Sequence, residues 1–264
     1  MRVFFDDAQF DFQTLRLLGS AASGDAEAGE VLSTAARIAP GDFSSWTAQW
    51  LATAQRVHRI AGDCRERGHV VSARQAYLRA ANYYRAAEFY LHGDPADPRI
   101  RQLSREARTC FQAALALGRD EVRTLAVPYE GTTLPGYYYP AAGAAGRAAT
   151  LVVHTGFDGT QEELRAAALA ANARGMHCVT FEGPGQGRSS ASRGCRSGRT
   201  GRRSSRPCST TCSRCRAQTR TVSRCWGSAS AAISRPGQPR SSTGWLPASP
   251  TAASSNGLLT CRPA

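Results

Sequence analysis

The chain has 264 residues and a formal net charge of +13, with 33 basic residues, all of them arginine, against 20 acidic ones. Every acidic residue lies at or before Glu182, whereas 13 of the arginines fall in the segment 189–264. That segment lacks Asp, Glu, His, Tyr, Phe and Met, which excludes an ordinary enzyme domain there and predicts a disordered basic tail.

Residues 1–188 are neutral overall and contain enough Ala, Leu, Val and aromatic residues for a hydrophobic core. Their first positions carry Asp6, Asp7 and Asp11 in place of an apolar leader, and no run of about 18 apolar residues occurs in the chain. We therefore expect a cytoplasmic protein that does not enter the membrane. Without a secretory leader, the nine cysteines do not predict a disulfide framework.

The segment 10–118 has the apolar spacing of helices. One helix is expected to begin at residues 44–46. Two further helices are expected over residues 72–91 and 101–117. Trp46, Trp50 and Val57 share one face of the first helix, and Gly118 ends the last. Paired helices of this kind also occur in tetratricopeptide-type scaffolds, although no 34-residue period is sustained in this chain.

From Glu121 onward the pattern changes from helical to alternating. Residues 122–129 and 134–139 alternate around Glu130-Gly131-Thr132-Thr133 and predict an antiparallel hairpin. The segments expected next are a buried strand over 150–153, an amphipathic helix over 161–173 and a buried strand over 176–181. A strand, a helix and a strand of these lengths predict a crossover between parallel strands.

Two glycine-containing loops follow the two buried strands, at the edge where open α/β sheets carry their sites. They are His154-Thr155-Gly156-Phe157-Asp158-Gly159-Thr160 and Glu182-Gly183-Pro184-Gly185-Gln186-Gly187. Glycines in the first loop let the backbone turn sharply and direct N–H groups toward a developing negative charge, as in an oxyanion hole. A phosphate-binding interpretation competes for the second loop, which lacks the spacing and the Lys of a P-loop.

Residues 1–188 resemble the N-terminal half of an α/β-hydrolase with a helical N-terminal domain, of the group of 2,6-dihydroxypseudooxynicotine hydrolase and the fermentation-respiration switch esterase. The resemblance rests on V-P-Y-E-G-T-T-L-P-G-Y at 127–137, on G-F-D-G-T-Q-E-E at 156–163 and on the second loop. It implies an α/β fold with a mainly parallel sheet and flanking helices. The implied organisation is a helical domain over 1–118, a truncated hydrolase core over 119–188 and a tail over 189–264.

The resemblance also implies chemistry. An elbow serine activated by His and Asp would attack the substrate, and the backbone N–H groups of Gly156 and Phe157 would hold the oxyanion. Small-molecule substrates of such enzymes range from esters to compounds with a carbon–carbon bond next to a ketone. The resemblance implies no cofactor.

The family's G-x-S-x-G elbow and its Asp and His do not follow in this chain. The closest string is W-G-S-A-S-A-A at 226–232, and the tail contains no His and no acid. No catalytic residue can therefore be assigned, and we expect the chain as written to be inactive.

A shifted reading frame explains the tail. In this frame each new codon consists of the third base of one present codon and the first two bases of the next. The codons for Cys225 and Trp226 then encode only Leu, and those for Trp226 and Gly227 encode only Gly. Continued through Ile233, the frame permits L-G-I-S-F-G-G-Y, which is a nucleophile elbow. The same shift from Arg188 permits V-V-R-E-Q-G-L-P-F-R-P-D-W, which is how the family continues. We interpret residues 189–264 as out of frame.

Other interpretations of the tail remain open. Cys208-x3-Cys212-x2-Cys215 has zinc-like spacing without an evident fourth ligand, so no metal is expected. An arginine-rich segment without acids binds nucleic acid through phosphates, but without sequence specificity. The alternative function is a helical scaffold or a nucleic-acid-binding protein that uses the basic tail. The substrate and the oligomeric state do not follow from the sequence.

Overall fold

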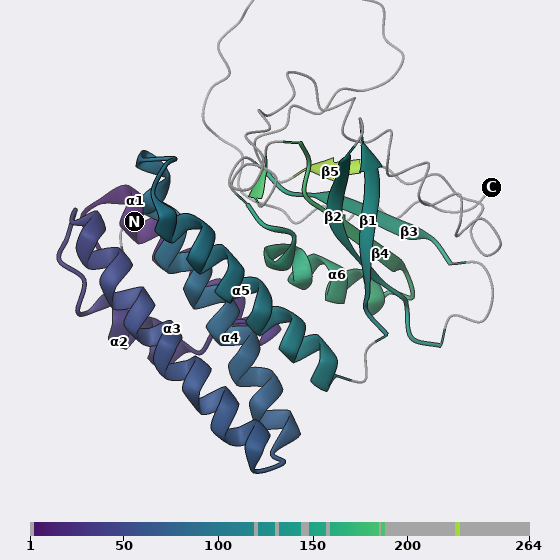
Figure 1. Ribbon diagram of the computed structural model, residues 1–264, viewed down its shortest axis with the longest axis horizontal. Helices are drawn as coiled ribbons and strands as arrows, with labels where there is room; N and C mark the ends of the chain where they lie inside the picture. Colours follow the sequence, from purple (N-terminus) through teal and green to yellow (C-terminus); the bar gives the residue numbers. More distant parts are fainter. Residues whose placement is uncertain are drawn as a thin grey trace, which may run out of the picture. The chain divides into compact units, whose positions relative to one another are not determined.

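The computed structural model describes residues 3–187, except 119–120, 130–131, 144–147, 157–158 and 185, together with the strand Cys225–Gly227. The expected disordered tail, apart from that strand, lies outside the described residues. The chain divides into two compact units, and all described residues belong to the first, Met1–Ala231. In this unit a helical region is followed by a small mixed sheet (Figure 1).

The helical region confirms the expectation for residues 10–118. Its elements are α1 (Ala8–Gly19), the 3₁₀ turn η1 (Ser20–Ser23), α2 (Ala28–Ala35), α3 (Phe43–Glu66), α4 (Val70–Glu88), the 3₁₀ turn η2 (Phe89–Gly93) and α5 (Pro98–Leu117). Asp42 caps α3 by accepting the N–H groups of Ser44 and Ser45. α5 begins earlier than expected because Asp97 caps it and Pro98 takes its first position, and Gly118 ends it as predicted.

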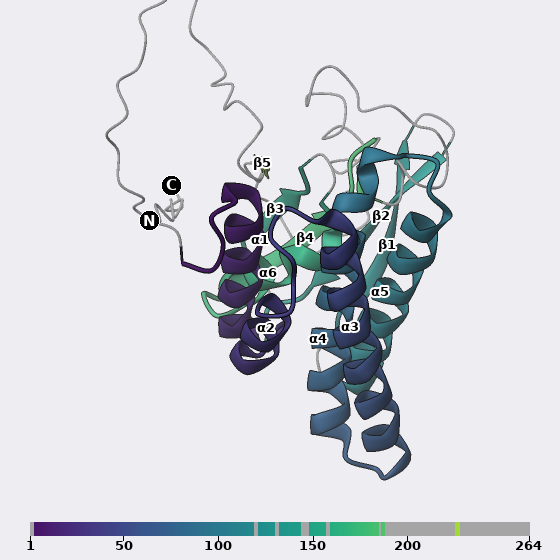
Figure 2. The same ribbon diagram turned by 90° about the vertical axis from the view of Figure 1, so that its left-hand side faces the viewer.

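α3 and α4 form a helical hairpin across a short turn. Gly68 takes the left-handed conformation with φ 74°, which a side chain would oppose. The N–H of His69 donates to the carbonyl of Cys64 at 2.8 Å and so satisfies the end of α3. Figures 1 and 2 show α3, α4 and α5 side by side.

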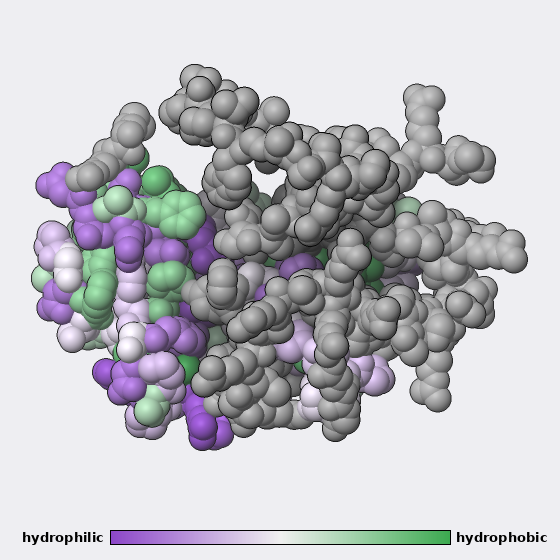
Figure 3. Space-filling model, turned by 90° about the horizontal axis from the view of Figure 1, so that it is seen from above, coloured by the Kyte–Doolittle hydropathy of each residue, from purple (hydrophilic) through white to green (hydrophobic). Residues whose placement is uncertain are grey.

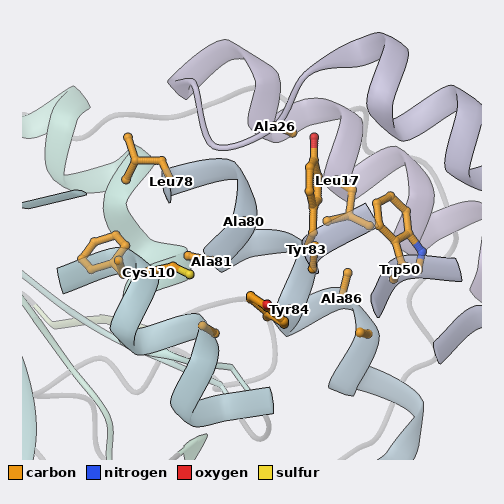
Figure 4. Close-up of a cluster of buried hydrophobic side chains, with 14 of the residues drawn as sticks. Leu17, Ala26, Trp50, Leu78, Ala80, Ala81, Tyr83, Tyr84, Ala86 and Cys110 are labelled. Atoms are coloured by element: carbon orange, nitrogen blue, oxygen red, sulfur yellow. The ribbon is translucent and has the colours of Figure 1, made fainter. Parts of the chain in front are cut away.

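Aromatic side chains fill the centre of the helical region. Trp46 and Trp50 are fully buried in α3, and the Trp46 ring lies 5.0 Å from Phe10 and 5.2 Å from Tyr90 between centroids. α4 packs against them with small residues that allow close approach of the helices (Figure 4). Tyr83 of α4 joins this core at 5.4 Å from Trp50. Trp46, Trp50 and Tyr83 thus belong to one hydrophobic core cluster that joins α3 to α4.

The sheet has the strand order β1-β2-β4-β3-β5. Its strands and the intervening helix are β1 (Arg123–Tyr129), β2 (Thr132–Tyr139), β3 (Thr150–His154), the 3₁₀ turn η3 (Gln161–Leu164), α6 (Arg165–Asn172), β4 (His177–Phe181) and β5 (Cys225–Gly227). β1 and β2 form the predicted antiparallel hairpin, and β2 pairs antiparallel with β4. β3 is parallel to β4, as predicted, and also to β5.

The two faces of the sheet contribute to two apolar clusters, since side chains alternate along a strand. Tyr137, Tyr139, Val153 and Cys178 belong to the same cluster as the helical core. The other face carries a smaller cluster of Val127, Leu134, Val152, Val179 and Phe181. β4 is buried along its whole length, as expected for a strand between two others with both faces covered.

The helix expected over 161–173 differs from the observed one at its start. Residues Gln161–Leu164 form a 3₁₀ turn, and the α-helix proper covers Arg165–Asn172. Such tight first turns are common at helix N-termini. Here the side chains of Thr160 and Glu163 bond each other's backbone N–H in a capping box, which fixes the turn.

On the face of the molecule shown in Figure 3, the described surface mixes hydrophilic and hydrophobic residues. The exposed large apolar side chains among the described residues come from different helices, for example Phe12 of α1 and Val71 of α4. No helix within the described ranges has the length and apolarity that a membrane crossing requires.

We expect Gly136→Ala to destabilise the sheet. A Cβ at residue 136 of β2 would lie 2.8 Å from the backbone oxygen of Thr180 and 3.3 Å from the Cβ atoms of Leu125 and Phe181. The backbone of the neighbouring strand β4 would have to shift to relieve this clash. The free energy of unfolding should therefore fall by about 1–3 kcal/mol in guanidinium titrations. In the control Gly62→Ala, within α3, the Cβ meets no atom within 4 Å, and stability should rise by about 1 kcal/mol. Equal effects of the two substitutions would contradict this packing.

Candidate active site

The first loop (residues 154–160) begins where β3 ends. The N–H of Thr155 donates to the carbonyl of Phe181 at 3.2 Å, which extends the β3–β4 pairing by one bond. The N–H of Gly159 donates to the carbonyl of Gly156 at 3.3 Å and closes a tight turn. Gly156 lies at the start of this turn, whereas Phe157, the other expected oxyanion donor, lies outside the described residues.

His154 also belongs to this edge of the sheet, but its ring is engaged locally. Its Nδ1–H donates to the carbonyl of Thr155 at 2.8 Å, and its ring lies 5.9 Å from that of Phe181. This bond holds the imidazole against its own loop. His177, at the opposite end of its strand, accepts the N–H of Ala141 through Nδ1, and burial lowers its pKa.

The second loop (residues 182–187) follows β4 and turns just as tightly. The N–H of Gln186 donates to the carbonyl of Gly183 at 3.1 Å. Gly187 has φ 45°, and a Cβ there would lie 2.7 Å from Cδ of Glu182, so only glycine fits this position. The close approach of the Glu182 carboxylate explains why residue 187 is a glycine, so this glycine does not indicate a phosphate ligand.

Side chains of the second loop fasten it to the first. Oε1 of Gln186 accepts both the hydroxyl of Thr155 at 2.8 Å and the N–H of Gly183 at 2.7 Å. Glu182 is only 2% exposed and accepts the N–H of Gln161 at 3.4 Å. Since β3 and β4 are parallel, both loops leave the sheet at its carboxyl edge, and these bonds make them one connected structure.

The first loop is also connected to the helical region. Glu163, at the end of its capping box, forms ion pairs with Arg16 of α1 and Arg85 of α4. A cavity of about 90 Å³ lies beside these groups. Its lining includes polar residues such as Asn82 and Glu162 and apolar residues such as Trp46 and Phe111. The expectation that no metal is bound stays a prediction, and within the described ranges no group of three or more potential ligands is assembled.

Sequence reasoning located both loops but not the bonds that hold them in place. Thr160 and Glu163 were detectable, because a Thr followed three residues later by Glu is the signature of a capping box. For Gln186 the local sequence indicates only a place in a turn. Arg85 could not be found, because 78 positions separate it from its partner Glu163.

We expect Gln186→Ala to weaken the connection between the loops. The substitution removes the acceptor for the Thr155 hydroxyl and for the Gly183 N–H, so the free energy of unfolding should fall by about 1–3 kcal/mol. Gln75→Ala, at an exposed position of α4, is the control and should change stability by less than about 0.5 kcal/mol. Urea titration followed by circular dichroism measures both. A Gln186→Ala variant as stable as the parent would show that the second loop does not support the first.

Comparison with known proteins agrees with this architecture. Hydrolase LUC6 of a Fusarium species is 42% identical over 192 residues, and alpha/beta hydrolase xenA of Xenoacremonium sinensis is 37% identical over 192 residues. These alignments cover 71% of this chain and 46% and 45% of the two relatives. The chain resembles the α/β-hydrolases. It spans about half the length of these curated relatives.

A solved structure extends the α/β-hydrolase likeness to the fold. The crystal structure of the 2,6-dihydroxy-pseudo-oxynicotine hydrolase superposes with a TM-score of 0.51 at 24% sequence identity. The superposition covers 64% of this chain and 46% of that one. No family model matches the chain. The helical region followed by the start of a hydrolase sheet is thus the arrangement that the sequence resemblance implied.

Proposed function

We propose that this chain is the N-terminal half of a serine hydrolase of the α/β-hydrolase type, joined to a segment read in another frame. In this proposal residues 1–118 form a helical domain and residues 119–188 begin the hydrolase core. The sequence likeness to α/β-hydrolases and the fold likeness to a solved hydrolase support it. The substrate is a small molecule with an ester or a carbon–carbon bond next to a ketone.

The likeness of 71% of the chain to α/β-hydrolases, next to a segment 189–264 without acidic residues, carries the proposal. Cys225–Gly227 pairs in parallel with β3, and Gly227 lies opposite His154, where the first loop begins. β5 therefore ends beside that loop. The shifted frame encodes its elbow across the codons for residues 225–233, so a strand of the restored chain in this position would lead into the elbow serine. A strand that ends at a nucleophile elbow, next to the loop that supplies an oxyanion donor, is the arrangement that acyl transfer requires.

In the proposed mechanism the elbow serine attacks the carbonyl carbon of the substrate while a His accepts its proton. An Asp orients that His. The oxyanion accepts backbone N–H groups at Gly156 and Phe157, and the His then protonates the leaving group. Water then attacks the acyl-serine while the His accepts its proton, and the His returns that proton to the serine oxygen as the acid leaves.

The chain as written does not contain this machinery in the segment 189–264, which has no His and no acidic residue. An oxyanion donor contributes nothing to the rate unless a nucleophile creates the oxyanion. We therefore propose that this chain is catalytically inactive. The change of frame lies near the codon for Arg188, since both the acidic residues and the family-like text end there.

The nucleotide sequence of the segment 188–264 tests the proposal. Translated one base out of the present frame, the segment should give a G-x-S-x-G elbow across the codons for 225–233, and the same frame continued past codon 264 should give an Asp and a His. A shifted translation without that serine, or without any later His, would overturn the proposal. The basic-tail alternative would then be the better explanation of this segment.

A further inference from the structure

Glu163 is the point at which the first loop meets the helical region. Its Oε2 accepts the N–H of Thr160 at 2.8 Å, the last amide of the loop. The same oxygen accepts Nε of Arg85 at 3.2 Å, and Oε1 pairs with Arg16. One carboxylate thus bonds a loop amide and two guanidinium groups that come from two helices, α4 and α1.

These contacts are largely shielded from solvent. Arg85 is 4% exposed, and its Nη1 also pairs with the buried Glu88 at 3.5 Å. Glu88 in turn bonds Nε2 of His92 at 2.7 Å. Burial opposes ionisation of Glu163, but Arg85 and Arg16 outweigh it and hold the pKa of the carboxyl below its usual value. The carboxylate is therefore charged at neutral pH, and its bonds are charge-assisted.

We propose that Glu163 is a positioning residue for the reaction, through which the helical region fixes the geometry of the oxyanion loop. Glu163 acts through the Thr160 N–H and does not touch the substrate. The turn from Gly156 to Gly159 is anchored at its other end by Thr155, which bonds Gln186 of the second loop. The two described ends of the loop are thus both held by side chains, and an oxyanion hole requires a restrained backbone of this kind.

A second ion pair between the same two parts of the unit provides a matched control. Nη1 of Arg165, two residues after Glu163, donates to Oδ1 of Asp25 at 2.9 Å and to the carbonyl of Ser23 at 2.7 Å. Burial raises the pKa of Asp25, and Arg165 opposes that rise. This pair connects α6 to the helical region without a hydrogen bond to any described loop residue. Breaking it weakens the same packing and leaves the loop bonds intact.

Hydrogen–deuterium exchange of the full chain as written tests the positioning directly. In Glu163→Gln, peptides that cover residues 155–160 should exchange about tenfold faster or more, because the charge-assisted bonds to Thr160 and Arg85 are weakened. In Asp25→Asn the same peptides should stay within about twofold of the parent. Arg16→Gln, which removes only the half-exposed partner, should give a smaller increase and serves if Glu163→Gln does not fold. Equal loop exchange in the Glu163→Gln and Asp25→Asn variants would overturn the inference, as would parent-like exchange in Glu163→Gln.

The catalytic part of the inference rests on the proposed function and has its own readout. In the frame-restored chain, Glu163→Gln should lower kcat about ten- to a hundredfold at nearly constant KM, because a misplaced oxyanion donor affects the transition state. Asp25→Asn should change neither constant. A restored enzyme insensitive to Glu163→Gln would overturn the positioning role. A restored chain that is inactive while the exchange result holds would instead refute the proposed function.

Discussion

A one-base correction near the codon for Arg188 is expected to convert an inert chain into an esterase. Nothing upstream needs to change, because the first loop is already present and the N–H of Gly159 already donates to the carbonyl of Gly156 to close its turn. On the proposed function, the gene read on in the corrected frame, past codon 264, supplies the serine, the Asp and the His, which act as a unit. Hydrolysis of p-nitrophenyl acetate by the chain as written should equal that of a heat-denatured control, whereas the corrected chain should turn over.

The control for this prediction is the corrected chain in which the serine encoded across the codons of Ser228 and Ala229 is replaced by alanine. Loss of the nucleophile alone should reduce kcat by about 10⁴-fold or more, as in other serine hydrolases. Retained hydrolysis in this variant would place the activity elsewhere. A corrected chain without activity toward either activated esters or ketones with a cleavable adjacent bond would count against the family's chemistry.

Trp46→Ala is expected to cause the largest loss of stability of any single substitution considered for this chain. The indole is fully buried, and its Nε1–H donates to the carbonyl of Ala86 at 2.8 Å, which joins α3 to α4. It also contacts the rings of Phe10 and Tyr90. A cavity of this size and the lost hydrogen bond should lower the free energy of unfolding by about 3–5 kcal/mol.

Two further variants separate the contributions at this position. Trp46→Phe keeps most of the ring but not the hydrogen bond, so it should cost less than Trp46→Ala. Val71→Ala, at an α4 position that is 71% exposed, should change stability by less than about 0.5 kcal/mol. Guanidinium unfolding followed at 222 nm gives all three values. A Trp46→Ala variant with parent-like stability would show that the aromatic cluster is not the core of the helical region.

The sequence was sufficient to predict the elements whose ends are marked by local chemistry. Gly118 ends α5, and the run from Thr150 to Val153 reads as a buried strand because it is apolar and β-branched. The start of α5 was placed late, because the first turn of that helix is polar and only Asp97-Pro98 marks its beginning. β5 was not predicted, since its three residues have no strand pattern of their own and, among the described residues, pair with β3.

The candidate site was predictable in outline and not in its connections. The positions of both loops could be predicted from the glycines that follow the two strands, because glycines and strand ends are local features of the sequence. The bonds of Gln186 to Thr155 and of Glu163 to Arg85 join residues 31 and 78 positions apart. Periodicity and turn signals carry no information about such pairs, so only the folded chain shows them.

Labelling by a fluorophosphonate probe tests the central claim most directly, because the probe reacts only with an activated serine. The chain as written and the frame-restored chain should be compared at equal concentration, with the label located by peptide mass spectrometry. We predict no label on the chain as written and one label per restored chain, on the elbow serine that follows β5. Stoichiometric labelling of the chain as written, or no labelling of a folded restored chain, would contradict the account.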